Sequence, residues 1–205
     1  MITALLNGYL MPTDQGNPAF CAVYLIETPA GRVLFDCGHV GRRRALLTAL
    51  SERGLSPADI DAVVLSHGHW DHLQNADLFG RVLLHPAELR YLRNPAPEDL
   101  GTPRWAAGVL DGLEIGEVVE ADEVLPGVAV IELPGHTPGS IGLVVEQDSA
   151  VLTGDAVPSA GVLVSRQPLG RSSDPARAEE SIGRVVSLAG MVYPGHDRPF
   201  RITQN

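Results

Sequence analysis

The sequence of 205 residues contains no lysine, so all 15 of its basic residues are arginines. Acidic residues number 25, and the formal net charge is −10. A negatively charged protein repels polyanions at long range, which makes nucleic acid a disfavoured partner unless arginines gather locally. We therefore do not expect nucleic acid as a partner.

Long apolar runs are also missing. No stretch approaches the ~20 apolar residues that a membrane-spanning helix needs. The first residues enter a strand-like segment, without the basic and then apolar regions of a secretory signal. We therefore expect a cytoplasmic protein with no membrane span. The content of 44% hydrophobic and 20% charged residues is typical of a globular protein, and we expect one domain over residues 1–205.

Cysteine is scarce, since the chain has only Cys21 and Cys37. Residues 18–27 and 31–36 are predicted to form a hairpin that places the two cysteines nearly opposite each other. A change of register by one residue decides whether their side chains share a face. The predicted hairpin permits a disulfide between them, but reduced thiols are expected in a cytosolic protein.

Strand and helix patterns alternate along the chain and predict an α/β (α+β) fold with two sheets, covered by helices on both outer faces. Two irregular segments, 92–112 and 156–173, are expected to flank a functional site. The predicted strands cover residues 2–10, 18–27, 31–36, 62–65, 81–84, 128–133, 141–146, 150–153 and 191–193. The predicted helices cover residues 41–53, 72–78, 86–91 and about 175–189, the last with Asp174 as its N-cap.

The densest chemical motif is the seven-residue stretch Ser66–His72, which reads Ser-His-Gly-His-Trp-Asp-His. It follows the apolar stretch Ala62–Leu65, so its metal-binding groups begin where a buried strand ends. Alternate side chains of an extended segment share a face, and His67 and His69 are therefore expected to point the same way.

A helix that starts near Trp70 would bring Asp71 and His72 to the same pocket. Imidazole nitrogens and carboxylate oxygens suit zinc and similar divalent metals. The motif is dense enough to supply ligands to two metal ions rather than one.

Three later strand ends each carry one further candidate ligand after a glycine turn. His136 follows the strand 128–133, Asp155 follows 150–153, and His196 follows 191–193. Alone, such a residue is more often part of an ordinary turn. Together with the first motif they form a single candidate set of metal ligands, namely His67, His69, Asp71, His72, His136, Asp155 and His196.

This set resembles that of the metallo-β-lactamase-fold superfamily of metallohydrolases, and the likeness spans essentially the whole chain. Residues 66–79 are locally similar to a small group within it, metallo-β-lactamase-domain-containing protein 1 and its microbial relatives. The resemblance implies a four-layer αββα sandwich with the site at one edge, between the two sheets. It also implies two metal sites, one held by His67, His69 and His136 and one by Asp71, His72 and His196, with Asp155 bridging both.

The resemblance implies a dinuclear metallohydrolase. Two divalent ions would lower the pKa of a bridging water to roughly 7, and the resulting hydroxide would attack a small ester, thioester, amide or phosphoester. Asp71 is expected to orient this nucleophile and pass a proton to the leaving group. Asp36 matches a strand-end aspartate of the superfamily and is expected to accept a hydrogen bond from a histidine of the first motif. Zinc is the favoured metal, and manganese or iron would also fit.

At two positions the chain differs from members of the superfamily that act on particular substrates, and these differences narrow the expected substrate class. Many lactone-opening relatives carry a tyrosine three residues after the bridging aspartate, where this chain has Pro158. Zinc β-lactamases of the commonest subclass hold a cysteine at the position of Asp155, so β-lactamase activity is not expected.

Two other functions stay open at this point, a mononuclear iron enzyme of the persulfide-dioxygenase kind and a metal-binding protein without catalysis. His85 is expected to be structural, and His39 is expected at the rim of the pocket. The sequence does not determine the substrate or the oligomeric state.

Overall fold

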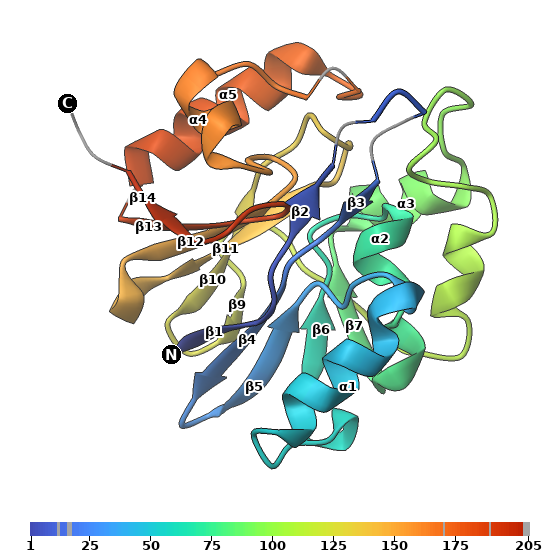
Figure 1. Cartoon of the computed structure of the whole chain (residues 1–205), viewed down its shortest axis with the longest axis vertical. Coiled ribbons are helices and arrows are strands. Elements are labelled where there is room, and N and C mark those ends of the chain that lie inside the picture. Colours follow the sequence, from blue (N-terminus) through green and yellow to red (C-terminus); the bar gives the residue numbers. More distant parts are fainter. Residues whose placement is uncertain (12, 16–17, 170, 189, 203–205) are drawn as a thin grey trace.

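Two six-stranded mixed sheets form the centre of the protein (Figure 1). The computed structural model describes residues 1–11, 13–15, 18–169, 171–188 and 190–202. The first sheet has the order β1-β4-β5-β6-β7-β8. Its strands are β1 (Ile2–Leu6), β4 (Val23–Thr28), β5 (Gly31–Phe35), β6 (Ala62–Val64), β7 (Arg81–Leu84) and β8 (Glu114–Glu117).

The second sheet has the order β14-β13-β12-β11-β10-β9. Its strands are β9 (Glu123–Leu125), β10 (Val128–Glu132), β11 (Ile141–Val145), β12 (Ala150–Gly154), β13 (Met191–Pro194) and β14 (Phe200–Arg201). A separate hairpin joins β2 (Tyr9–Leu10) to β3 (Ala19–Phe20).

Strand direction decides where the polar turns lie. In the first sheet β5, β6, β7 and β8 are parallel, so the residues after β5 and β6 leave the sheet at the same edge. In the second sheet β12 and β13 are also parallel, and the turns after them likewise share an edge. β10 runs in the same direction as β12, because both are antiparallel to β11. In the second sheet the ends of β10, β12 and β13 therefore share one edge, and with the end of β6 in the first sheet they are the four strand ends after which candidate ligands were predicted.

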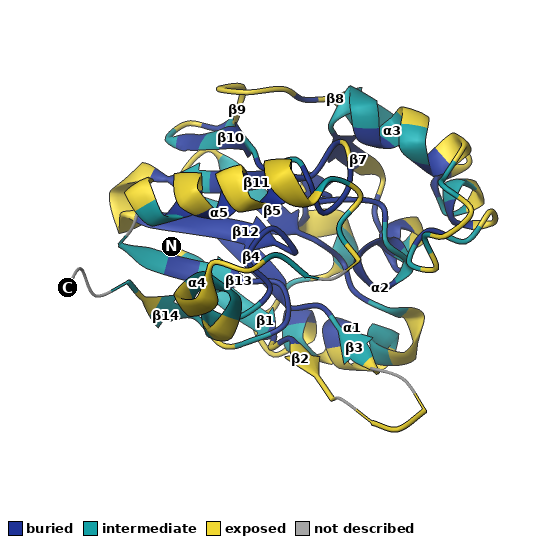
Figure 2. Cartoon of the chain, turned by 90° about the horizontal axis from the view of Figure 1, so that it is seen from above, coloured by how far each residue is buried: buried dark blue, intermediate teal, exposed yellow. Residues whose placement is uncertain are grey.

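The buried apolar side chains form three clusters, and these clusters lie between four layers of helices and sheets. In β4, Tyr24 and Ile26 point into the cluster between the two sheets, whereas Val23 and Leu25 point into the cluster under the helices of the first sheet. A third apolar cluster lies between the second sheet and α5 (Pro175–Leu188). The order is therefore helix, sheet, sheet, helix, which confirms the predicted αββα sandwich, and Figure 2 shows buried strands between helices whose outer faces are exposed.

The outer helices bury residues at helical spacing. In α1 (Arg43–Ser51), Leu46 and Leu50 are four residues apart and fully buried. In α5, Ile182 and Val185 face the second sheet. The carboxylate of Asp174 accepts a hydrogen bond from the backbone N–H of Arg177, as expected of an N-cap.

The remaining helices are short. They are α2 (Trp70–Leu73), α3 (Pro86–Arg93) and α4 (Ala160–Ser165), together with 3₁₀ turns at Val40–Arg42, Pro57–Asp59, Ala76–Leu78, Ala106–Leu110 and Glu146–Asp148. None of the helices in the described ranges is long and apolar enough to cross a membrane.

Several predicted boundaries were wrong. The predicted strand 2–10 breaks after Leu6, because the chain leaves the sheet to pass Gly8 against the turn that contains Gly195. The predicted strand 18–27 also breaks, and the N–H of Ala22 bonds to the Gly195 carbonyl at 2.6 Å. Ala189, at the predicted end of the last helix, lies outside the described residues.

Other differences concern short elements. Three strands were missed, β8, β9 and β14, because they are short and carry charged residues in place of an apolar run. The predicted helix 72–78 starts earlier, at Trp70, and is interrupted before a 3₁₀ turn. The segment 156–173 contains α4. Cys21 and Cys37 are both buried free thiols.

Candidate metal centre

The residues predicted as metal ligands converge on one edge of the sandwich, where they form two groups. One ligand atom from each residue of a group lies within 4.8 Å of the others. The residues of the first group follow β6, β10 and β12, whereas those of the second lie within α2 and after β13. The first consists of His67, His69, His136 and Asp155, and the second of Asp71, His72 and His196.

Within the first group, Nε2 of His136 lies 3.1 Å from Nδ1 of His69. Within the second, Oδ2 of Asp71 lies 3.9 Å from Nε2 of His72 and 3.6 Å from Nε2 of His196. All of these residues except His69 are buried. In each group, several donor atoms therefore face one small volume to which water has little access.

Asp155 lies between the two groups. Its Oδ2 is 3.5 Å from Nε2 of His136, in the first group. Its Oδ1 is 3.5 Å from Nε2 of His72 and 3.1 Å from Nε2 of His196, in the second. The two oxygens of one carboxylate thus face different sets of imidazoles.

Unpaired buried atoms show that the two groups fit divalent cations. Nε2 of His67, Oδ2 of Asp71 and Nε2 of His72 are buried without a hydrogen-bond partner among the described residues. A buried polar atom without a partner is costly, and a bound cation would remove that cost. Imidazole nitrogen and carboxylate oxygen are donors that zinc, manganese and iron accept.

The electrostatics of the first group agree with this fit. Burial, together with neighbouring imidazoles, holds the pKa of His67 well below its ordinary value, and burial lowers the pKa of His136 to about 3. Both rings are therefore neutral at pH 7 and keep a lone pair for a metal. Burial alone would raise the pKa of Asp155, but His196 and His72 hold it well below the ordinary range. Asp155 is therefore an anion.

Asp36 orients the first motif from the end of β5. Its Oδ2 lies 2.8 Å from Nδ1 of His72, which directs the other nitrogen of that ring towards the second group. Its Oδ1 accepts the N–H of Ser66, whose hydroxyl lies 2.9 Å from Nδ1 of His67. Asp36 has a φ of +60°, an uncommon backbone conformation for a residue other than glycine. Such strain is often found where a side chain must be aimed at a functional site.

Comparison with known proteins agrees with this arrangement. The family model of the metallo-β-lactamase superfamily matches residues 16–196. The chain belongs to this superfamily. It is 34% identical over 211 residues to metallo-β-lactamase domain-containing protein 1 of Xenopus laevis, covering 100% of this chain and 82% of the relative. The human protein of the same name is 36% identical over 188 residues, which cover 87% of this chain and 62% of the human one.

Solved structures show the same fold. A provisionally assigned metallo-β-lactamase of Thermotoga maritima has a TM-score of 0.78 at 20% identity, with 98% of each chain covered. An N-acyl homoserine lactone hydrolase, solved with its product at the catalytic metal centre, has a TM-score of 0.71 at 22% identity. That match covers 89% of this chain and 85% of the hydrolase.

Asp99 is a residue of this metallo-β-lactamase domain that the sequence did not indicate. Its Oδ1 lies 3.3 Å from Nε2 of His69, so the other ring nitrogen of His69 faces the first group. Tyr91 and Thr102 donate hydrogen bonds to its Oδ2, and the N–H of Gly101 donates to its Oδ1. The only local signal is an Asp-Leu-Gly sequence typical of a turn in which aspartate bonds to the backbone.

The two predicted loops both contact the site. In 92–112, the carbonyl of Gly101 accepts the N–H of Trp70, and a Cβ at Gly101 would lie 2.7 Å from the His69 ring. In 156–173, the Pro158 carbonyl accepts the N–H of His196 at 2.8 Å. Both segments therefore border the candidate ligands.

The two remaining histidines belong to neither group. His85 caps α3 by accepting the N–H of Ala87, and its Nε2 lies 3.1 Å from Glu132. The ring of His39 lies between those of Phe20 and Trp70, at centroid distances of 4.9 and 4.8 Å. His85 thus has structural contacts, and His39 packs against Trp70 of the first motif.

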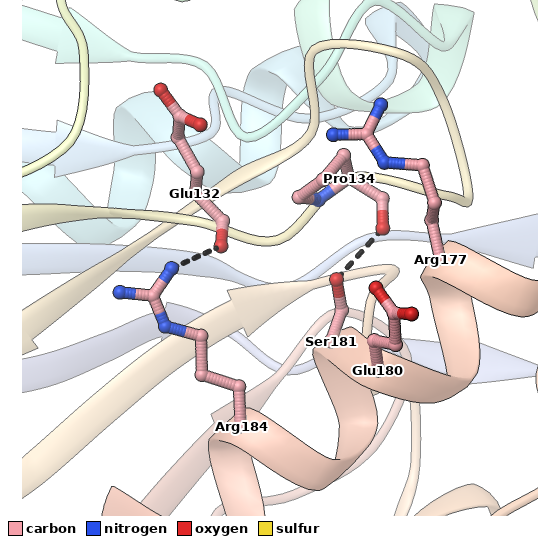
Figure 3. Close-up of a pocket in the computed structure, with 6 residues that line it drawn as sticks. All are labelled: Glu132, Pro134, Arg177, Glu180, Ser181 and Arg184. Carbon is pink, nitrogen blue, oxygen red and sulfur yellow. Dashed lines mark hydrogen bonds between the residues drawn. The ribbon is translucent and has the colours of Figure 1, made fainter.

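A pocket of about 210 Å³ lies apart from the metal centre, between α5 and the end of β10 (Figure 3). There the hydroxyl of Ser181 donates to the Pro134 carbonyl at 2.7 Å, and Arg184 donates to the Glu132 carbonyl at 3.1 Å. None of the candidate ligands lines this pocket. Its hydrogen bonds hold α5 against the turn that carries His136.

Proposed function

We propose that this metallo-β-lactamase domain is a dinuclear hydrolase that cleaves a small ester, thioester, amide or phosphoester. The observation that carries the proposal is the position of Asp155, whose two oxygens face separate groups of imidazoles. A carboxylate placed in this way can be shared by two cations. Zinc is the proposed metal because the donors are mainly imidazoles, and manganese or iron would also fit.

Each candidate residue then has a defined task. His67, His69 and His136 would hold one cation, and Asp71, His72 and His196 would hold the other, with Asp155 available to both. Bound divalent cations supply Lewis acidity and a coordinated water whose pKa is about 7. Asp71 would orient the attacking water, accept the proton that this water gives up and pass it to the leaving group, and Asp36 would keep His72 in the tautomer that frees its Nε2.

The proposal favours acyclic substrates over lactones. The lactone hydrolase with the shared fold shows that such a site can open a lactone ring, but its identity to this chain is only 22%. Pro158 stands where many lactone-opening relatives carry a tyrosine, and proline has no hydroxyl to offer a substrate. We therefore expect esters or phosphoesters to react better than lactones.

The alternative is a mononuclear iron enzyme of the persulfide-dioxygenase kind. Such a site needs two histidines and one carboxylate, and it would leave the second group without a cation. Oδ2 of Asp71 and Nε2 of His72 would then stay buried and unpaired, which is unfavourable. The second group therefore favours the hydrolase.

Metal analysis of protein purified without added metal, combined with a panel of activated esters, phosphodiesters and lactones, tests the proposal. We expect about two metal ions per chain, and hydrolysis that stops with a chelator and returns with zinc or manganese. A protein that holds one iron, consumes oxygen with a persulfide and hydrolyses nothing would establish the dioxygenase instead.

A further inference from the structure

A fully buried carboxylate lies behind the first group of candidate ligands. Glu88, in the first turn of α3, has no exposed surface. Its Oε1 accepts the backbone N–H of Gly68 at 2.8 Å. Its Oε2 accepts the N–H of Gly139 at 2.9 Å and the hydroxyl of Thr137 at 2.8 Å. No cationic side chain donates a hydrogen bond to Glu88 or pairs with it among the described residues.

These three donors come from the two turns that carry the first group. Gly68 lies between His67 and His69, which follow β6 of the first sheet. Thr137 directly follows His136, beyond β10 of the second sheet. Glu88 therefore connects, through one side chain, the turns that supply three imidazoles from two different sheets.

The backbone is packed closely around this carboxylate. A Cβ at Gly139 would lie 2.3 Å from the backbone nitrogen of Glu88, and a Cβ at Gly68 would lie 2.6 Å from the side chain of Leu92, also in α3. Both turns thus rest directly on α3. Their positions are fixed relative to that helix, and Glu88 is the side chain whose hydrogen bonds join them.

Only a carboxylate satisfies the donors at this position. The N–H groups of Gly68 and Gly139 face different oxygens, and both can only donate. A glutamine has a single acceptor oxygen, so in either orientation its NH₂ group would meet one of these N–H donors. Burial raises the pKa of Glu88, while the hydrogen bonds from Thr137, Gly68 and Gly139 act in the opposite direction.

We infer that Glu88 is a positioning residue for the first metal site, setting the spacing of His67 and His69 relative to His136 across the gap between the sheets. This inference rests on the proposed function, since it assumes that the first group binds a cation. Among the described residues, no hydrogen bond or ion pair joins Glu88 to Asp71, His72 or His196, so its effect is expected at the first site only. Partners that orient metal ligands typically contribute about 10–100-fold to metal affinity.

The test is a metal titration of the full chain with Zn²⁺ against a chromophoric chelator, and with Co²⁺ followed by absorption. His136→Ala and His196→Ala identify which binding step belongs to each group. Glu88→Gln is expected to weaken the first step by about 10–100-fold, to leave the second unchanged, and to regain hydrolysis in excess metal. Glu179→Gln, an exposed position on α5, is the matched control and should behave as the wild type.

A second pair of variants keeps the inference testable if Glu88→Gln does not fold. Thr137→Val removes the hydroxyl donor and should weaken the first step, whereas Thr137→Ser keeps the donor and should not. Unchanged first-step affinity in Glu88→Gln, an equal loss at both steps, or equal behaviour of the two Thr137 variants would each overturn the inference. If the wild type binds no metal, the proposed function fails, whereas normal binding by the wild type together with an insensitive Glu88→Gln refutes the Glu88 inference alone.

Discussion

Oδ1 of Asp99 lies 3.3 Å from Nε2 of His69, and this contact links a candidate ligand to the loop 92–112. The same carboxylate accepts hydrogen bonds from Tyr91, Gly101 and Thr102. One side chain thus fixes the orientation of an imidazole and the fold of the loop beside it. The loop therefore borders the candidate metal centre and also supplies a residue, Asp99, that orients one of its ligands.

Asp99→Asn is expected to lower metal affinity or activity by about 10–100-fold, because the amide can present its NH₂ group to the ring nitrogen of His69 and lose the orienting hydrogen bond. Metal titration and the rate of ester hydrolysis measure the effect. Asp111→Asn, at an exposed position just beyond the loop's 3₁₀ turn, is the control and should change neither quantity. Equal results for the two variants would remove Asp99 from the metal centre.

Asp155→Ala should lose at least one metal ion and reduce hydrolysis by more than about 100-fold, since a shared ligand matters more than the partners that orient ligands. Metal content per chain and activity in the same preparation provide the measurement. His85→Ala removes a histidine that caps α3 and bonds to Glu132, and it should keep both metals. Two bound metals and full activity in Asp155→Ala would contradict the bridging role.

The seven candidate ligands that the sequence singled out lie together in the structure, because most of them follow strand ends. His136, Asp155 and His196 each follow an apolar strand and a glycine turn, and the parallel pairing of β12 with β13 brings the last two to one edge. The sandwich itself was predictable from the alternation of apolar segments. Long, regular patterns of this kind are stabilised mainly by burial and therefore leave a clear trace in the sequence.

Among the residues that orient the ligands, Asp36 was predicted from the sequence, but Asp99 and Glu88 were not. Asp99 lies in an irregular segment, and Glu88 occupies the first turn of a helix, where an acidic residue is common for reasons of helix stability alone. Their roles depend on backbone N–H groups and ring nitrogens of residues distant in sequence. The missed strand β8 has a related cause, since its pairing with β7 compensates for a short and charged sequence.

Leu100→Ser tests whether the loop 92–112 sets specificity. Leu100 is 72% exposed and precedes Gly101, which borders the His69 ring, so a bound substrate can cover its side chain. Partial burial of a leucine contributes about 1 kcal/mol, so KM for substrates with apolar groups should rise roughly fivefold with unchanged metal content. Leu188→Ser, at the end of α5, should leave KM unchanged, and identical KM values for both variants would exclude this role of Leu100.

Gly8→Ala should displace His196 of the second group, although Gly8 is not itself a candidate ligand. A Cβ at Gly8 would lie 2.2 Å from the Gly195 carbonyl oxygen and 2.7 Å from the Cα of His196, so the turn that carries this candidate ligand must shift. Overpacking of this kind costs about 1–3 kcal/mol of unfolding free energy, which denaturant unfolding of the metal-free protein measures. The metal-binding step assigned to His196 should weaken as well.

The control for this prediction is Gly80→Ala, because no atom of the described residues other than its chain neighbours lies within 4 Å of a Cβ there. It should unfold at the same denaturant concentration as the wild type, within the ±0.5 kcal/mol or so that is usual for surface substitutions. If Gly8→Ala matches Gly80→Ala in both stability and metal binding, the turn at Gly195 adapts without cost. In that case the close packing at Gly8 does not determine the position of His196.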